Sequence, residues 1–287
     1  MASCFGDGVS AAKLDVEPFK FHHTLMGHPA LELGNLARVI PALPKSQVMY
    51  AARQLQNGDD FESTFRTRPE SQTIEETIEN IRVSDGYIMV NSPQVDASFT
   101  PVYQQLIADV ESLMHTRGLG REAITPKLFL FIASPNSVTP FHLDRYSTFL
   151  MQFRGSKHVT VSQPWDERVV SARDCENYVS YVNTHLPWTP EKDAFATTYT
   201  FAPGDALHIP FVSGHHVRNG ADDVSISMSI IFNTAQTMAW RSALNFNQRA
   251  RKVLRHVGLG PAPVGHRPLS DSVKARLWST WAQLRYG

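Results

Sequence analysis

The sequence is poor in cysteine and has no long apolar run. Its 287 residues include two cysteines, Cys4 and Cys175. Because Cys4 lies near the N-terminus, we expect no structural disulfide and a reducing compartment. The first residues lack the basic start and apolar run of a secretory signal, and no segment approaches the length that spans a bilayer. We therefore expect a cytoplasmic protein that does not contact membranes.

Net charge is also absent, but the charges are unevenly placed along the chain. Lys and Arg together number 27, and so do Asp and Glu. The segment 235–287 holds nine of the basic residues but one acid, Asp271. A basic tail of this kind can contact nucleic acid. A helical tail with a solvated basic face explains the same pattern. We favour this second interpretation, so nucleic acid is not an expected partner.

The first part of the chain mixes irregular and helical signals. Residues 1–45 contain turn signals and are expected to form an irregular arm or an added strand. Apolar residues at helical spacing predict helices over 71–83 and 99–118. A short strand is expected over 86–92. With 42% apolar and 19% charged residues, the chain has the composition of a soluble globular protein.

From residue 127 the pattern changes to short segments rich in β-branched and aromatic residues. Strands are predicted over 127–134, 148–155, 157–163, 197–210 and 224–233. No helix-length pattern separates the strands between 127 and 163, so the sheet should be antiparallel, as in a jelly roll or barrel. The polar insertion 164–196 is either a substrate-contacting lid or a surface loop, and both alternatives stay open.

Two amphipathic helices are predicted near the C-terminus, over 238–257 and 270–286. They either pack on the body or build a homodimer. We therefore divide the chain into a domain over 1–235, with a core at about 83–235 and an arm at 1–45, and a helical extension over 236–287.

A group of polar residues stands within the predicted strands. Alternate residues of a strand share one face, so His142 and Asp144 point the same way, at or just after the end of the strand 127–134. An imidazole and a carboxylate side by side form two thirds of the facial triad that holds iron(II). A short loop after Pro210 delivers His215 and His216 at the start of the next strand, so a third ligand is available there. These two adjacent histidines should face opposite ways, and His208 is an alternative on the preceding strand.

Two further residues suit an anionic ligand. Lys157 follows His142 across a predicted hairpin with the turn "RGSK", and its ammonium group suits a carboxylate. Thr139 can donate a hydroxyl hydrogen bond to the same ligand. A metal ion together with an anionic cosubstrate would explain why these polar residues stand in apolar strands.

These motifs carry a family resemblance over roughly residues 127–233. The stretches "VTPFHLDRYSTFLMQFRGSKHV", "PGDALHIPFVSGHHV" and "VSISMSIIF" resemble the JmjC and cupin-like oxygenases that depend on iron(II) and 2-oxoglutarate. In particular they resemble the branch that includes the asparaginyl hydroxylase acting on hypoxia-inducible factor. The family order of Thr, His-x-Asp, Lys, a Gly-Asp turn, Ile-Pro and His runs here from Thr139 to His215.

The resemblance implies a role for each matching residue. His142, Asp144 and His215 would ligate iron, and Lys157 with Thr139 would bind the distal carboxylate of 2-oxoglutarate. Other residues are expected nearby: Thr148 and Ser229, where some relatives have asparagines near the cosubstrate, and Arg145, Tyr146 and Trp165 at the substrate entrance.

The implied fold is mainly β, a double-stranded β-helix (jelly roll) of cupin or JmjC type with C-terminal helices. The implied activity is hydroxylation of an unactivated C–H bond, in a protein or peptide side chain or in a small metabolite. Dioxygen and 2-oxoglutarate would be converted to succinate and carbon dioxide. One alternative is a non-catalytic cupin-like regulator that binds a metal or ligand and contacts nucleic acid through its basic tail. Another is an isomerase or dioxygenase of the wider cupin group, whose sites usually have three or four histidines.

Overall fold

A computed structural model describes residues 3–52, 55–64, 74–83 and 85–286 of the chain. The described strands are β1 (Phe19–His22), β2 (Val48–Ala52), β3 (Gly86–Asn91), β4 (Ile124–Ala133), β5 (Val138–Leu143), β6 (Ser147–Arg154), β7 (Lys157–Ser162), β8 (Ala196–Phe201), β9 (Asp205–Ile209), β10 (Gly214–Asn219) and β11 (Ser225–Asn233). The described α-helices are α1 (Leu33–Ala42), α2 (Phe61–Thr64), α3 (Ile74–Asn80), α4 (Thr100–Arg117), α5 (Ala172–Val179), α6 (Ala235–Leu254) and α7 (Pro268–Tyr286).

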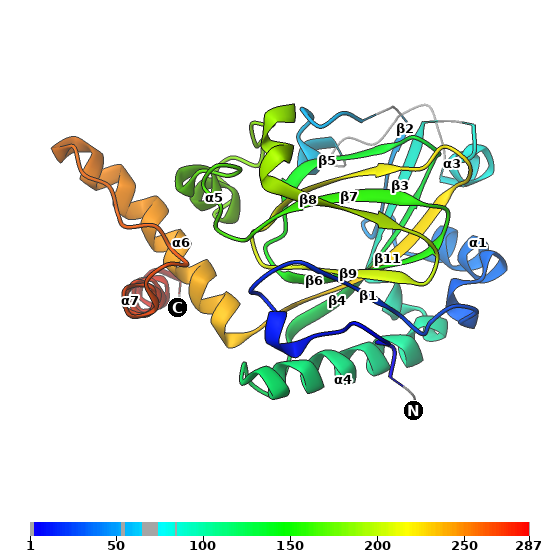
Figure 1. Ribbon diagram of the computed structural model, residues 1–287, viewed down its shortest axis with the longest axis horizontal. Coiled ribbons are helices and arrows are strands. Elements are labelled where there is room, and N and C mark those ends of the chain that lie inside the picture. The colour runs from blue at the N-terminus through cyan, green and yellow to red at the C-terminus, as the bar shows by residue number, and fades with distance from the viewer. Residues whose placement is uncertain (1–2, 53–54, 65–73, 84, 287) are drawn as a thin grey trace.

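The strands form two antiparallel sheets that face each other (Figure 1). The larger has seven strands in the order β1-β9-β6-β11-β4-β3-β2, and the smaller has four in the order β5-β10-β7-β8. The chain passes repeatedly from one sheet to the other, as it does in a jelly roll. The predicted fold class, a mainly antiparallel jelly roll with C-terminal helices, is confirmed.

The predicted hairpin between β6 and β7 is wrong, because β6 lies in the larger sheet and β7 in the smaller one. The link Gly155-Ser156 is as short as a hairpin turn, which explains the error. Here it carries the chain across the edge of the barrel instead. Gly155 adopts a φ of 67°, a conformation that suits glycine.

Alternate residues of the larger sheet point to opposite faces. One face packs into a hydrophobic core, and the other lines a cavity. On β11, Ile226, Met228 and Ile230 pack into the main hydrophobic core, which also contains the buried face of α4. The intervening Ser227 and Ser229 line the cavity between the sheets. The outer face thus supplies much of the hydrophobic stabilisation, and the inner face is left for polar groups.

The N-terminal arm contains irregular segments and a strand, which the sequence suggests, and also a helix, which it does not predict. Strand β1 is the expected added strand and pairs with β9 at the sheet edge. Helix α1 was not predicted, although Leu36, Val39 and Ile40 are buried against the core. Its ten residues include Gly34 and Pro41, which weaken the helical signal. Of the predicted helix 71–83, residues 71–73 lie outside the described residues, and α3 forms part of the rest.

The C-terminal helices α6 and α7 pack against each other and project from the barrel (Figure 1). Their exposed apolar side chains are Val253, Leu269, Val273, Leu277 and Leu284. A homodimer through these helices stays a prediction. None of the helices within the described ranges is long and apolar enough to cross a membrane.

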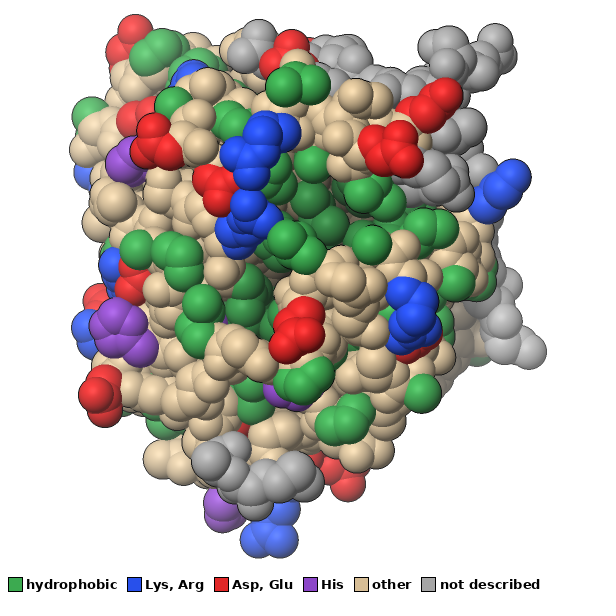
Figure 2. Space-filling model, turned by 90° about the vertical axis from the view of Figure 1, so that its right-hand side faces the viewer, with side chains coloured by type: hydrophobic (Ala, Val, Ile, Leu, Met, Phe, Trp, Pro, Cys, Tyr) green, Lys and Arg blue, Asp and Glu red, His purple; other side chains and the backbone are tan. Residues whose placement is uncertain are grey.

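The body carries mixed charges. Figure 2 shows one face of it, on which acidic and basic side chains are interspersed around a hollow with hydrophobic side chains. A face of this kind offers no extended single-sign surface for a nucleic acid.

We predict that Gly155→Ala destabilises the fold strongly. A Cβ atom at Gly155 would lie 2.6 Å from the backbone oxygen of Val224. Steric overlap and the positive φ together should lower the free energy of unfolding by about 3 kcal/mol. Gly118→Ala is the matched control, because Gly118 has a φ of 79° but open space around it. It should lose about 1 kcal/mol. Equal losses in urea unfolding would contradict the role of the close contact.

Candidate metal centre

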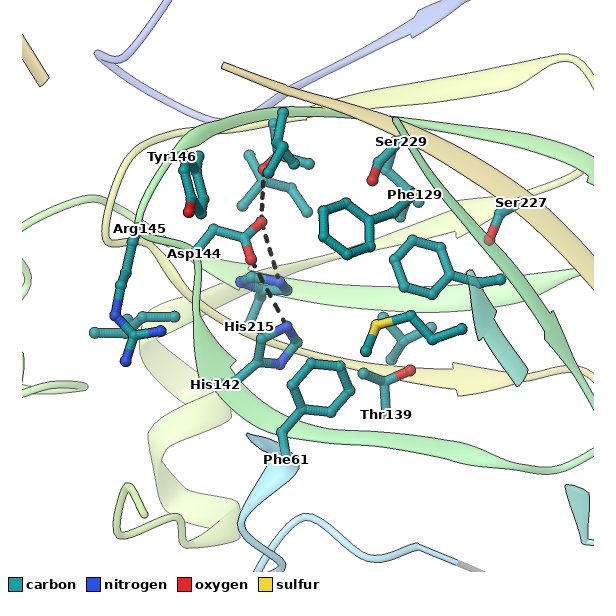
Figure 3. A pocket seen from close by; sticks show the side chains of 18 of the residues that line it. Phe61, Phe129, Thr139, His142, Asp144, Arg145, Tyr146, His215, Ser227 and Ser229 are labelled. Atoms are coloured by element: carbon teal, nitrogen blue, oxygen red, sulfur yellow. Dashed lines mark hydrogen bonds and ion pairs between the residues drawn. The ribbon is translucent and has the colours of Figure 1, made fainter. Parts of the chain in front are cut away.

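Three predicted ligands converge at one end of the cavity (Figure 3). His142 on β5 lies opposite His215 on β10 in the strand register, and Asp144 follows the end of β5. One ligand atom from each residue lies within 4.8 Å of the other two. The Asp144 carboxylate is 3.9 Å from Nε2 of each histidine. Two imidazoles and one carboxylate at this spacing form a facial set for a divalent metal.

Backbone carbonyls orient both imidazole rings. Nδ1 of His142 lies 2.7 Å from the Pro140 oxygen, and Nδ1 of His215 lies 2.9 Å from the Ser213 oxygen. A carbonyl only accepts, so Nδ1 must carry the proton in each ring and Nε2 keeps its lone pair. Burial lowers the pKa of His142, with a further contribution from neighbouring His215, so the ring stays neutral and available to a metal.

Asp144 is held by hydrogen bonds to both its side chain and its backbone. The hydroxyl of Thr148 donates a 2.6 Å hydrogen bond to Oδ2 of Asp144. The N–H of Val212 donates to the Asp144 backbone oxygen at 3.1 Å. Thr148, expected near the cosubstrate, therefore lines the cavity and also restrains a predicted metal ligand.

The two alternative histidines face away from the three ligands. His216 pairs with Asp193 at 3.0 Å. His208 contacts the rings of Phe19 and Phe149 in the core outside the cavity. Strand alternation explains both positions, since His216 follows His215, and His208 precedes the cavity-lining Ile209. Within the described part of the chain, the group therefore has two histidines and not three.

The cavity beyond the ligands measures about 220 Å³ and contains a buried lysine. Nζ of Lys157 donates to Oγ of Ser227 at 2.8 Å. None of the described carboxylates forms an ion pair with it, and burial lowers the pKa of Lys157 to about 7. Because a buried cation is costly unless it is paired, this end of the cavity is suited to an anion.

The other predicted cosubstrate residues line the same cavity from its two sides, Thr139 from the smaller sheet and Ser229 from the larger one. Thr139 and Ser229 both line it, and the Thr139 hydroxyl lies 3.1 Å from the hydroxyl of Tyr87. Around them the wall is largely apolar, with Phe129, Phe131, Leu150, Ile209, Val217 and Ile231. The polar groups are therefore few and fixed within a hydrophobic enclosure, as in most small-ligand sites.

Two of the three residues expected at the entrance line the cavity. Arg145 forms an ion pair with Glu62 and lies between the rings of Tyr178 and Tyr181, at 4.2 and 3.8 Å from their centroids. Tyr146 also lines the cavity and lies near Arg241 of α6.

The third residue, Trp165, is not among the cavity-lining residues. Its ring packs against Phe211 and Trp240 under the C-terminal helices. The expectation that it borders the entrance does not match this position. Its positive φ of 65° marks a turn after β7 that the sequence pattern did not reveal.

Sequence patterns missed several residues of this site. Phe61 of α2 stacks on His142 with a centroid distance of 4.3 Å, and Tyr178 of α5 lines the cavity. Neither belongs to a predicted element, and α5 lies inside the insertion 164–196. Tyr87 and Met89 belong to the predicted strand 86–92, so alternation along that strand was the one available signal for them.

Comparison with known proteins gives one family match. The family model described as "Cupin-like domain" matches residues 22–238. No curated protein matches the chain.

Solved structures give more distant similarities. An X-ray structure of E. coli ycfD is 14% identical with a TM-score of 0.46, and the match covers 99% of this chain and 70% of that one. A structure of YcfD, a ribosomal oxygenase from Escherichia coli, in complex with cobalt and 2-oxoglutarate is 15% identical with a TM-score of 0.47. That match covers 95% of this chain and 65% of the other, so this chain spans about two thirds of its length.

We predict that His215→Ala weakens binding of cobalt(II) more than 100-fold, because it removes one of three ligand atoms. His216→Ala should change the dissociation constant less than about threefold, since His216 faces Asp193. Anaerobic isothermal titration calorimetry measures both variants beside the wild type. Equal losses in the two variants would contradict the assignment of His215.

Proposed function

The chain belongs to the cupin-like domain family, and on that premise we propose that it is an oxygenase dependent on iron(II) and 2-oxoglutarate. It would hydroxylate an unactivated C–H bond of a protein or peptide side chain or of a small metabolite. Its metal ligands would be His142, Asp144 and His215, and Lys157 would hold the cosubstrate.

One observation carries this proposal: a facial triad and a buried lysine that forms no ion pair with the described residues border the same cavity. Two histidines and one carboxylate that leave metal positions open are typical of non-haem iron(II) oxygenases. The lysine adds a requirement for an anion in the same enclosure. A metal-binding module alone has no need for Lys157, and an anion-binding module has no need for the triad.

The residues present fit 2-oxoglutarate, which has a carboxylate at each end. The ammonium of Lys157 and the hydroxyl of Thr139 can donate to the far carboxylate, and Ser227 and Ser229 line the same cavity from the opposite sheet. The apolar side chains around them match the methylene groups between the two carboxylates. When bound, iron with 2-oxoglutarate and dioxygen supplies an oxidant for C–H bonds, and 2-oxoglutarate becomes succinate and carbon dioxide.

The contributions of the protein itself are position and enclosure. Hydrogen bonds from Nδ1 fix both imidazoles, and Thr148 fixes the carboxylate. Phe61 covers one face of His142, and the cavity is walled mainly by apolar side chains. These features limit access of water to a reactive centre. Arg145 and Tyr146 would meet the substrate on its way in.

The alternatives are less well supported. An isomerase or dioxygenase with three or four histidine ligands would need a third imidazole, and His208 and His216 point elsewhere. A non-catalytic regulator with a nucleic-acid-contacting tail remains the second candidate. The basic residues in α6 and α7 favour it, because these helices project from the barrel (Figure 1).

We predict that purified protein with iron(II), ascorbate and dioxygen converts 2-oxoglutarate to succinate slowly even without its prime substrate. Asp144→Ala should reduce this rate by at least about 100-fold, because the carboxylate ligand is lost. Asp193→Ala is the matched control and should keep wild-type turnover, since Asp193 pairs with His216 outside the site. Succinate is quantified by mass spectrometry. No succinate from the wild type, together with no 2-oxoglutarate binding, would favour the non-catalytic module.

We predict that affinity for 2-oxoglutarate depends on the charge of Lys157. In the free protein burial lowers the pKa of Lys157 to about 7. The anion binds the protonated lysine, so the dissociation constant should stay level below about pH 7 and rise about tenfold per pH unit above it. Calorimetry with cobalt(II) bound measures this profile. Lys157→Met should bind at least about tenfold more weakly and lose the profile. The exposed Lys127→Met should match the wild type, and a level wild-type profile would contradict the role of Lys157.

A further inference from the structure

We propose that Asp15, in the N-terminal arm, is a positioning residue for the metal centre. It joins the two chain segments that hold Asp144 and His215 in place. This inference rests on the metal site of the proposed function and goes beyond it, since it assigns a role to a residue far from the site in sequence.

The Asp15 carboxylate is buried and connects two separate segments. The hydroxyl of Ser147, at the start of β6, donates to it at 2.7 Å. The backbone N–H of Phe211, just after β9, donates to it at 3.1 Å. Asp15 itself adopts a φ of 55°, which is uncommon for a residue other than glycine. The surrounding contacts hold it in this conformation.

The first branch leads through β6 to the Asp144 side chain. Ser147 precedes Thr148, whose hydroxyl donates to Oδ2 of Asp144 at 2.6 Å. His208 adds a second connection between the arm and Thr148. Its Nε2 accepts from the backbone N–H of Asp15 at 3.0 Å, so its Nδ1 carries the proton and donates to the Thr148 carbonyl at 3.1 Å. Thr148 is thus restrained through its own backbone and through its neighbour.

The second branch leads through the turn 211–213 to His215 and to the Asp144 backbone. The N–H of Val212 donates to the Asp144 carbonyl at 3.1 Å, and the Ser213 carbonyl accepts from the ring of His215 at 2.9 Å. Val212 has a φ of 56°, which is unfavourable for a β-branched residue. Asp15 anchors the residue that begins this strained turn, so it fixes where both contacts lie.

The charge state of the cluster supports a functional reason for Asp15. Its carboxylate has no arginine or lysine partner within the described ranges; the nearest basic group is His208 at 3.9 Å. Since Nε2 of His208 accepts a hydrogen bond, this ring is neutral. A buried carboxylate without a cation is costly, and an apolar residue would serve packing better. A role in holding two chain segments together explains why a carboxylate stands at this position, whereas packing alone does not.

The test compares two aspartates that both anchor the N-terminal arm. Asp15→Asn keeps the size of the side chain but offers one acceptor oxygen where two donors converge. Asp109→Asn is the control, because Asp109 on α4 accepts from the Cys4 N–H at 2.6 Å and from Gln105 at 3.2 Å, and these are its hydrogen bonds within the described residues. Cobalt(II) is the probe. Its dissociation constant and visible absorption spectrum report the metal site without any turnover.

We expect Asp15→Asn to weaken cobalt(II) binding by about 10–100-fold and to change the cobalt spectrum, as loss of a residue that orients ligands does. Asp109→Asn should leave both unchanged, even if it lowers the melting temperature as much. The double variant Asp15→Asn with Thr148→Val should lose less than the product of the single losses, because both act on Asp144.

Other outcomes overturn the proposal. It fails if Asp15→Asn binds cobalt(II) within about twofold of the wild type, or if both aspartate variants lose affinity in proportion to melting temperature. If Asp15→Asn does not fold, Ser147→Ala removes one branch alone and must give the same spectral change. Wild-type protein that binds cobalt(II) but not 2-oxoglutarate would contradict the proposed function and leave this inference standing. No cobalt(II) binding by the wild type would overturn both.

Discussion

The register between β5 and β10 is the constraint on which the site depends. It places His142 directly opposite His215, with ring centroids 4.1 Å apart. Because side chains alternate along a strand, a shift of one residue would bring His216 into the cavity and turn His215 outward. The register shifts between His215 and Val217, just beyond this pair. In this register the two adjacent histidines contact different groups, Ser213 and Asp193, on opposite faces of the sheet.

Given this register, the cavity divides into a ligand end and a cation end. At the ligand end, carbonyl acceptors and a threonine hydroxyl fix three metal-binding groups. At the other, Lys157 begins β7 and has a hydroxyl partner but no ion pair within the described ranges. Burying a cation opposes folding, and a bound anion removes that penalty. Lys157, whose burial destabilises the free protein, would therefore favour binding of a dianion whose second carboxylate reaches it. Ligands with one charge would bind more weakly.

The amino-acid sequence predicts most of the site residues but fewer of the residues that hold them in place. Alternation placed His142 and Asp144 on one face, and chain order with the family resemblance added Lys157, Thr139 and His215. Alternation cannot tell to which sheet a strand belongs, so the sequence predicts a hairpin at "RGSK" where the structure has a link between two sheets. Phe61, Tyr178 and Asp15 come from elements that local patterns did not predict. Their contacts with the site span more than 30 residues of sequence, for example 132 between Asp15 and Ser147. No local propensity encodes such pairs; they follow from the folded topology.

The helical extension is linked to the site more closely than its place at the end of the chain suggests. Glu176 of α5 is buried and forms a two-point ion pair with Arg251 of α6 at 2.7 and 2.8 Å. A buried pair of this kind fixes geometry more than it adds stability. On the barrel side, α5 supplies Tyr178 to the cavity wall, while α6 brings Arg241 to 5.9 Å from the ring of Tyr146. Helix α6, which leaves Val253 exposed, thus also lies near a residue that lines the cavity. A partner bound along α6, whether a second copy or a substrate protein, would therefore contact an element that lies close to the cavity-lining Tyr146.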